Sequence, residues 1–159
     1  MIIALFAVDE AGGVGNNGTM PWPTIKEDLQ WFRETTLNQV VVMGKKSWHS
    51  PDMPKPLPKR ENIVITNNPI DGVICQGGNI PFTLKALDCR YPLNDIFVIG
   101  GVNILLQAKP ALNKLYITRI PGVHEADTQI DLDKFLNGFI LINTKDLGTC
   151  KVEEYEAIQ

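Results

Sequence analysis

Asp28 is a carboxylate within an otherwise apolar helical stripe. The segment TIKEDLQWFRETTLN, residues 24–38, predicts a helix whose core-facing positions repeat every three or four residues. These positions hold Ile25, Leu29, Phe32 and Thr36. Burial of a carboxylate costs free energy unless partners satisfy it, and desolvation raises its pKa, so Asp28 is a candidate for binding a polar ligand or relaying a proton. The alternative is the helix-dipole preference for acids in a first turn, which Glu27 meets equally well from the solvent face.

A second candidate feature follows the predicted strand in VVVMGKKSW, residues 40–48. Gly44 ends the strand, and Lys45, Lys46 and Ser47 open a short helix. Two cations and a hydroxyl at a helix N-terminus suit a phosphate group. The segment is not a P-loop, because Gln39 stands where that motif requires its earlier glycine. A solvated pair of lysines is the alternative interpretation.

Two further strand ends carry features that suit ligands. In FVIGGVN a strand ends at Gly100 and Gly101, and adjacent glycines let a ligand approach the backbone closely. IVIT is followed by NNP, whose two asparagines are polar, and Arg60 is the last residue of the proline-rich loop PDMPKPLPKR, residues 51–60. Arg60 is a candidate carboxylate clamp, or else a surface arginine. Together these segments predict a two-ligand cleft for a phosphorylated cofactor and a small molecule contacted by a carboxylate.

The segment GVGNNG, residues 13–18, matches the glycine pattern of a dinucleotide-binding turn but not its context. The motif needs a helix at its last glycine, whereas TMPWP follows here and its prolines disfavour helical dihedrals. The helix is expected to start at Thr24, where Thr24 and Glu27 match a capping box. The acid required after a second strand is also missing, since Glu34 lies within the helix. We therefore predict a mobile flap able to close over a ligand, with an ordinary surface loop as the alternative.

Strand-like and helical segments alternate along the chain. Strands are predicted at 2–8, 40–43, 62–66, 72–75, 96–100, 114–120, 139–144 and 151–158, and helices near 24–36, 45–50, 82–90 and 102–108. Several strands are apolar throughout, which is typical of a parallel sheet buried on both faces. We expect an α/β fold with a mostly parallel central sheet of about eight strands, flanking helices and an antiparallel C-terminal strand. The proline-rich loop is interpreted as a rigid loop rather than a domain linker, because too few residues would be left for a partner domain. Residues 1–159 are therefore expected to form one domain.

Composition excludes several functional classes. The 159 residues are 44% hydrophobic and 21% charged, with a net charge of −3, which gives no reason to expect nucleic acid or an anionic membrane as partner. Cys75, Cys89 and Cys150 are odd in number and widely spaced, which favours reduced, buried thiols over disulfides. His49 and His124 have no metal-ligand spacing. The short N-terminal apolar run ends in two acids and is predicted to be a strand rather than a signal peptide, so we expect a cytoplasmic protein.

The order and spacing of five segments resemble a known enzyme family. MPWP…DLQWFRETTLN, VVMGKKSW, LPKREN, VIGG and LYITRI…EADT are similar to dihydrofolate reductase of the bacterial and phage kind, over about residues 2–128. The C-terminal strands are compatible with that family but less diagnostic. The resemblance implies the family's α/β fold and an NADPH-dependent reductase.

The resemblance also implies a substrate site. Asp28, Trp22 and Thr118 would be the catalytic residues: Asp28 binds the pyrimidine edge of the pterin and supports protonation at N5, Thr118 hydrogen-bonds that carboxylate, and Trp22 lies near it through a water. Arg60 would hold the α-carboxylate of the substrate's glutamate. The pterin and benzoyl pocket would be lined by Ile3, Leu5, Phe32, Leu57 and Ile99.

On the cofactor side, the resemblance implies that the first loop closes over the nicotinamide and that Asp127 helps to hold the loop. The loop residues are Gly15, Asn16, Asn17, Gly18, Thr19 and Met20. Phosphates would be bound by Lys45, Lys46 and Ser47, with Lys45 favouring the 2′-phosphate. A cis peptide is expected at Gly100–Gly101. The remaining predicted cofactor positions are Leu5, Gly44, Thr66, Asn67, Gln76, Gly100, Gly101, Val102, Asn103, Ile104 and Leu105.

The chain departs from the family pattern at several positions. The first loop has two extra residues, in EAGG, and Met53-Pro54-Lys55 lengthens the loop on the side of the substrate's tail. Leu105 stands where many members have a tyrosine, Asn103 where a basic residue often touches phosphate, and Gln76 where a lysine often lies near adenosine. These changes predict altered loop dynamics and weaker cofactor contacts.

The implied reaction is hydride transfer from NADPH to C6 of dihydrofolate, with N5 protonated from solvent. One alternative is a riboflavin-pathway pyrimidine reductase, which shares the fold and NADPH but lacks the Pro-Trp and buried-acid pattern. Another is a binding or assembly protein that retains the fold with little turnover. The expected partners are dihydrofolate and antifolate inhibitors, with no nucleic acid, no membrane, no metal and a monomeric state.

Overall fold

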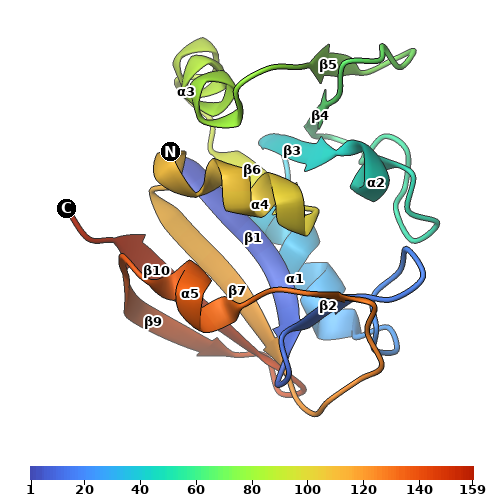
Figure 1. The fold of residues 1–159 in the computed structure, drawn as a ribbon, viewed down its shortest axis with the longest axis vertical. Helices are drawn as coiled ribbons and strands as arrows, with labels where there is room; N and C mark the ends of the chain where they lie inside the picture. The colour runs from blue at the N-terminus through green and yellow to red at the C-terminus, as the bar shows by residue number, and fades with distance from the viewer.

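An eight-stranded sheet forms the centre of the molecule (Figure 1). The computed structural model describes the backbone of residues 1–159 and every side chain except those of Cys75 and Gln76. The strand order is β5 (Ile74–Gln76), β4 (Glu61–Ile65), β3 (Val40–Gly44), β6 (Ile96–Gly100), β1 (Ile2–Asp9), β7 (Lys114–Ile120), β10 (Lys151–Ala157) and β9 (Phe139–Asp146). β10 pairs antiparallel with both β7 and β9, and the other pairs in this sheet are parallel. The expected mostly parallel sheet with an antiparallel C-terminal strand is confirmed.

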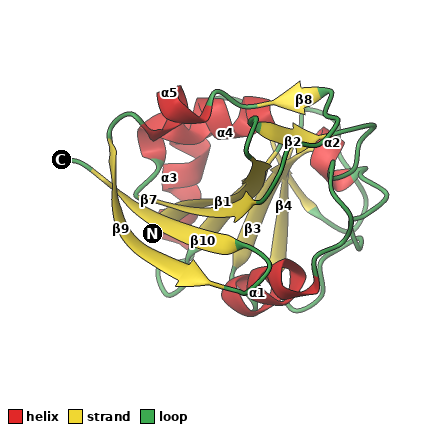
Figure 2. Ribbon diagram, turned by 90° about the horizontal axis from the view of Figure 1, so that it is seen from below, coloured by secondary structure: helices red, strands yellow, loops and turns green.

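Helices cover both faces of this sheet (Figure 2). The helix α1 (Lys26–Thr36) lies on one face, and α3 (Ile80–Arg90), α4 (Val102–Ala108) and α5 (Leu132–Leu136) lie on the other. The short α2 (Lys45–Trp48) follows β3, and a 3-10 turn, η1 (Lys109–Ala111), follows α4.

The central strand β1 supplies side chains to both faces. Because successive strand residues point to opposite faces, Ile2, Ala4, Phe6 and Val8 join the core under α3, α4 and α5. Ile3 and Leu5 join the cluster that Phe32 of α1 covers. The uninterrupted apolar sequence of this strand is therefore explained by burial on both sides.

Most element boundaries differ from the sequence prediction by one or two residues, and the shifts of β5 and α3 have a visible local cause. The strand expected at 72–75 is β5 at Ile74–Gln76, because Gly72 adopts a positive φ of 82° in the preceding turn. The helix α3 starts at Ile80 rather than near residue 82. Its N-cap is Asn79, whose side chain accepts a 2.9 Å hydrogen bond from the backbone of Phe82.

The predictions for the start and stripe of α1 were wrong in two respects. Ile25, not Thr24, is the N-cap, and no side-chain hydrogen bond caps the helix. With Ile25 as N-cap, Thr24 and Glu27 do not occupy the positions of a capping box, and the Glu27 carboxylate accepts a bond from the Thr149 hydroxyl at 3.1 Å. Leu29, expected to face the core, is 47% exposed. It lies between Ile25 and Phe32, which pack into two different clusters.

The glycine-rich segment after β1 is partly a strand, which the sequence analysis missed. β2 (Gly13–Gly15) pairs antiparallel with β8 (Thr128–Gln129) in a two-stranded ribbon separate from the main sheet. As expected, no helix follows GVGNNG directly, because α1 starts only at Lys26. The ribbon ties the first loop to the segment after β7.

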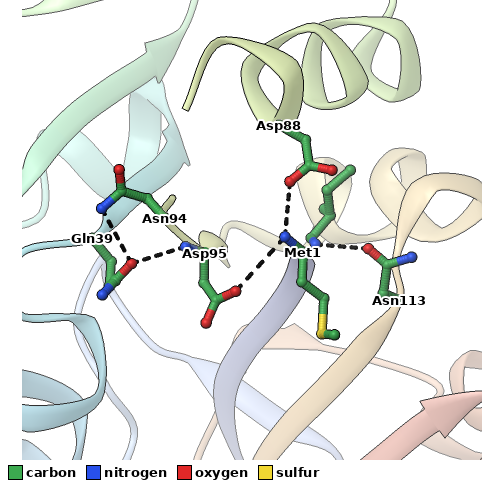
Figure 3. Close-up of polar contacts among 7 residues, drawn as sticks. Met1, Gln39, Asp88, Asn94, Asp95 and Asn113 are labelled. Atoms are coloured by element: carbon green, nitrogen blue, oxygen red, sulfur yellow. Dashed lines mark hydrogen bonds and ion pairs between the residues drawn. The ribbon is translucent and has the colours of Figure 1, made fainter. Parts of the chain in front are cut away.

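The amino-terminal edge of the sheet is held by a polar network (Figure 3). The Met1 ammonium lies 2.8 Å from Asp88 Oδ1 and 3.7 Å from Asp95 Oδ1. The amide of Ile2 donates to Asn113 Oδ1 at 2.7 Å, and Gln39 Oε1 accepts from the amide of Asp95 at 2.8 Å. These contacts align the starts of β1, β3, β6 and β7, so their carboxyl ends meet at the opposite edge.

Candidate active site

Asp28 and Thr118 form the polar centre of the site. Asp28 lies in the first turn of α1 and is 8% exposed, and Thr118 lies within β7 and is 2% exposed. The Thr118 hydroxyl donates a 2.9 Å hydrogen bond to Asp28 Oδ1. Burial raises the pKa of Asp28, while the bond from Thr118 acts in the opposite direction. In the part of the chain that the structure describes, no protein donor bonds to Oδ2, so this oxygen can receive a ligand.

Trp22 packs beside this centre in a small buried cluster. Trp22 is 6% exposed and shares the cluster with Ile120 and Cys150, against which Ile25 also packs. Burial, and then the negative charge of Asp28, raise the pKa of the Cys150 thiol. Cys150 is a free, buried thiol, as expected, whereas the expectation that the cysteines are buried was wrong for Cys89, whose side chain is exposed.

The five residues predicted to line an apolar pocket lie in one cluster, although they come from different elements. Ile3, Leu5 and Leu57 are buried in it, and Phe32 and Ile99 pack against it half-buried. The cluster lies on the same face of the sheet as α1. An apolar ring placed against it would meet Asp28 at its polar end, because Phe32 and Asp28 are one helical turn apart.

Arg60 is fixed by contacts with its surroundings. Its Nε donates to the Pro58 carbonyl at 2.9 Å, one terminal nitrogen donates to Thr36 Oγ1 at 3.2 Å, and its guanidinium lies 6.0 Å from the Phe32 ring centroid. Burial, and then the nearby charge of Arg33, lower its pKa. In the described residues no carboxylate pairs with it. Two grooves of about 390 and 420 Å³ flank Arg60, and neither lies over Asp28.

The first loop is held at both sides of its tip. Asn16 and Thr19 exchange backbone hydrogen bonds of 2.8 and 3.0 Å, which closes a tight turn. The Asn17 amide donates to Asp127 Oδ2 at 2.8 Å, so the implied contact of Asp127 with the loop is present. The Ser50 hydroxyl donates to the Gly18 carbonyl at 2.8 Å. The loop tip therefore lies against the segment that carries the two lysines.

The glycines of the predicted cofactor side create room near the backbone. The Gly100–Gly101 peptide is cis, as the resemblance implied. A Cβ atom on Gly101 would meet only Ser47 Oγ, at 4.0 Å, whereas one on Gly44 would lie 2.8 Å from Ile104 Cγ1. Gly44 thus allows α4 to approach β3, and Gly101 leaves space beside Ser47.

This side also carries unpaired donors and cations. The first helical bond of α4 joins the Leu105 amide to the Gly101 carbonyl, so the amides of residues 102–104 have no partner within the helix. Lys45 and Lys46 are exposed, and neither forms an ion pair with a described residue. Free amides, a hydroxyl and two cations around a space without side chains fit a phosphorylated cofactor.

Four further predicted cofactor positions lie in different surroundings. Leu105 is 2% exposed and packs in the core beneath α4, and its place among the cofactor-binding residues stays a prediction. The side chain of Gln76 lies outside the described residues. Thr66 and Asn67 follow β4 at the same edge of the sheet, where Thr66 Oγ1 accepts from the Asn68 amide at 3.2 Å.

The sequence analysis missed three residues next to this site. Asp9 is buried at the carboxyl end of β1, His124 bonds to it, and Ser50 holds the loop tip. For Asp9 a signal was available, because an acid directly after a fully apolar strand lies at the edge where ligands bind. For His124 and Ser50 no local pattern indicates their partners.

Comparisons with known proteins agree with this geometry. The family model described as dihydrofolate reductase matches residues 1–155. The chain is 32% identical over 154 residues to dihydrofolate reductase of Sus scrofa, covering 82% of this chain and 81% of the relative. It is 34% identical over 128 residues to that of Bacillus subtilis, with 80% and 73% covered. A solved dihydrofolate reductase from Enterococcus faecalis, complexed with NADP(H) and RAB-propyl, superposes with a TM-score of 0.78 at 27% identity, over 100% of this chain and 97% of that one.

The mostly parallel sheet has a buried acid on one side of its strand ends and groups that suit phosphates on the other. Together with the comparisons, this arrangement defines an α/β oxidoreductase that uses a phosphorylated nicotinamide cofactor. The chain belongs to the dihydrofolate reductase family and is an NADPH-dependent dihydrofolate reductase. None of its described helices is long and apolar enough to cross a membrane.

Proposed function

We propose that the chain converts 7,8-dihydrofolate to 5,6,7,8-tetrahydrofolate by hydride transfer to C6 and protonation of N5, and so supports one-carbon and thymidylate metabolism. The observation that carries the proposal is the buried Asp28, bonded through one oxygen to Thr118 and without a donor from any described residue at the other. A carboxylate that accepts at Oδ2 can bind the ring nitrogen and amino group of a pterin. Its negative charge favours a protonated pterin, which assists protonation of N5.

The rest of the protein would orient the two reactants. The apolar cluster around Ile3, Leu5 and Phe32 would hold the pterin and benzoyl rings, and Arg60 would bind the glutamate α-carboxylate. Trp22 would close the polar end of this pocket. These groups exclude water and align the ring with the cofactor, which is the protein's share of the rate enhancement.

NADPH would supply the hydride when bound. Lys45, Lys46 and Ser47 would bind its phosphates, with Lys45 at the 2′-phosphate, and the free amides at the start of α4 would face the pyrophosphate. Thr66 and Asn67 would flank the adenosine. Loop residues Gly15 to Met20 would cover the nicotinamide. We also propose that residues 1–159 act as one domain, as a cytoplasmic monomer that binds neither nucleic acid nor a membrane.

The test is NADPH oxidation by the purified protein, followed by absorbance with and without dihydrofolate and with an antifolate added. Oxidation that depends on dihydrofolate and stops with the antifolate would support the proposal. Antifolate and NADPH binding without turnover would instead support a binding or assembly protein that retains the fold. Turnover of a riboflavin-pathway pyrimidine, but not of dihydrofolate, would support the other alternative, which the comparisons do not favour.

A further inference from the structure

Asp9 is a second buried acid in the molecule, outside the pocket of Asp28. Its side chain is fully buried at the carboxyl end of β1. Oδ1 accepts from the amides of Ala11 and Gly13 at 3.0 and 2.8 Å, and Oδ2 accepts from the amide of His124 at 2.8 Å. Burial alone would raise the pKa of Asp9, but these hydrogen bonds outweigh it and lower the pKa. Asp9 is therefore a charged anchor that joins two loops.

His124 contacts this anchor through its ring as well as its backbone. Its Nδ1 lies 3.2 Å from Asp9 Oδ2, and its side chain is 24% exposed. The same ring meets Trp22 edge to face, with centroids 5.9 Å apart and planes at 71°. The imidazole is thus fixed on one side by a buried carboxylate and supports the Trp22 indole on the other.

The Asp9–His124 pair also holds the base of the ribbon that leads into the first loop. Gly13, bonded to Asp9, is the first residue of β2 and pairs with Gln129 of β8. A Cβ atom on Gly13 would lie 3.0 Å from Asp9 Oδ2, so glycine fits this contact best. Asp127 holds the far end of the ribbon through Asn17. The loop over the predicted nicotinamide position is therefore fixed at its base by Asp9 and His124.

We propose that His124 is a positioning residue for the reduction: fixed by Asp9, its imidazole holds Trp22 against the Asp28 pocket and links Trp22 to the base of the first loop. The inference rests on the proposed function for its kinetic consequence and on geometry alone for the contact. Among the residues that the structure describes, Asp9 is the one that lies within ion-pair distance of the His124 ring. The neighbouring elements carry Glu10, which accepts from the Gly122 amide at 3.0 Å, and Asp28 and Cys150 beyond Trp22.

The contact is tested at one fixed pH by tryptophan fluorescence of the ligand-free protein, because an imidazole packed edge to face against an indole affects its emission. His124→Asn, which removes the ring, should change the emission relative to the wild type, and the same substitution in a Trp22→Phe background should change it little. His49→Asn, which removes the histidine beside Trp48, is the matched control and should leave the emission of Trp22 unchanged. Emission that is unchanged in His124→Asn, or a change of equal size in the Trp22→Phe background, would overturn the positioning contact.

The kinetic consequence is tested with two substitutions that divide the contacts of His124. His124→Phe keeps a ring beside Trp22 without a bond to Asp9, and His124→Asn keeps a donor for Asp9 without the ring. Each should lower kcat about three- to tenfold while the KM for NADPH stays within about twofold, because alignment rather than binding is lost. Unchanged kcat in both variants would refute the inference. A wild type without turnover would refute the proposed function instead, and the fluorescence comparison would still decide the contact.

Discussion

The hydroxyl of Thr118 and the carboxylate of Asp28 are joined by a 2.9 Å hydrogen bond across 90 residues of sequence. The bond orients the carboxylate, occupies Oδ1 and leaves Oδ2 toward the site. It also offsets part of the cost of burying a charge. This pair is the basis of the first two predictions.

Asp28→Asn should lower turnover at neutral pH by about a hundredfold or more, the usual scale for losing a group that assists proton transfer. The loss should shrink with decreasing pH, because a substrate that is already protonated needs the carboxylate less. Steady-state rates across a range of pH measure this. An equal loss at every pH would show that Asp28 has no proton-related role.

The same substitution should stabilise the fold at neutral pH. Burial raises the pKa of Asp28, so the wild-type residue contributes its full stability only below its unfolded pKa of about 4, and this contribution is lost as the pH rises through the folded pKa. Asp28→Asn removes the buried charge and keeps an oxygen to accept from Thr118. We expect a gain on the order of 1 kcal/mol at pH 7 that disappears toward pH 4. Urea unfolding of both proteins measures it, and a less stable variant at pH 7 would contradict the reasoning.

The effect of Asp9→Asn on the free energy of unfolding should depend on pH in the opposite direction. The hydrogen bonds to Asp9 lower its pKa, so its contribution is present above about pH 4 and lost as the pH falls through the folded pKa. The variant should lose about 1–3 kcal/mol of unfolding free energy at pH 7, because the amide nitrogen cannot accept the bonds made to one oxygen. The difference from the wild type should narrow in acid. Chemical denaturation at several pH values tests this, with the exposed Asp52→Asn as a matched control that should change little.

Lys45→Ala should raise the KM for NADPH more than the KM for NADH, since only NADPH has the 2′-phosphate. Loss of one exposed lysine–phosphate contact is expected to cost about tenfold in KM. Lys46→Ala serves as the matched control, because it removes a neighbouring cation of the same helix. Equal effects of Lys45→Ala on the two cofactors would reject the 2′-phosphate assignment.

Local sequence patterns predicted much of the fold and the polar part of the site. Uninterrupted apolar runs such as residues 2–8 identified the parallel strands, because burial on both faces requires apolar side chains at every position. The stripe of α1 made Asp28 visible, since the energetic cost of a buried carboxylate is a local property of the helix pattern. The pair Gly100-Gly101 and the lysines Lys45 and Lys46 marked the cofactor side, because their residue types at strand ends are also visible in the local sequence.

Where long-range contacts compete with local preference, the prediction failed. Thr24 and Glu27 have the residue types of a capping box, but Thr149, far along the chain, takes the Glu27 carboxylate. The packing of α4 on the sheet buries the side chain of Leu105 in the core, which no local pattern around this residue indicated. The β2–β8 ribbon joins segments more than a hundred residues apart, and nothing in GVGNNG alone indicates its partner.

The sequence by itself determined the α/β class, the strand-end features and the position of a buried acid, because periodicity and residue type express burial directly. Only the tertiary structure decided which groups meet: Thr118 with Asp28, His124 with Asp9 and Trp22, and Ser50 with the loop tip. These pairings follow from the order and register of strands in the sheet. That order is set by the packing of the whole chain, and no local segment encodes it.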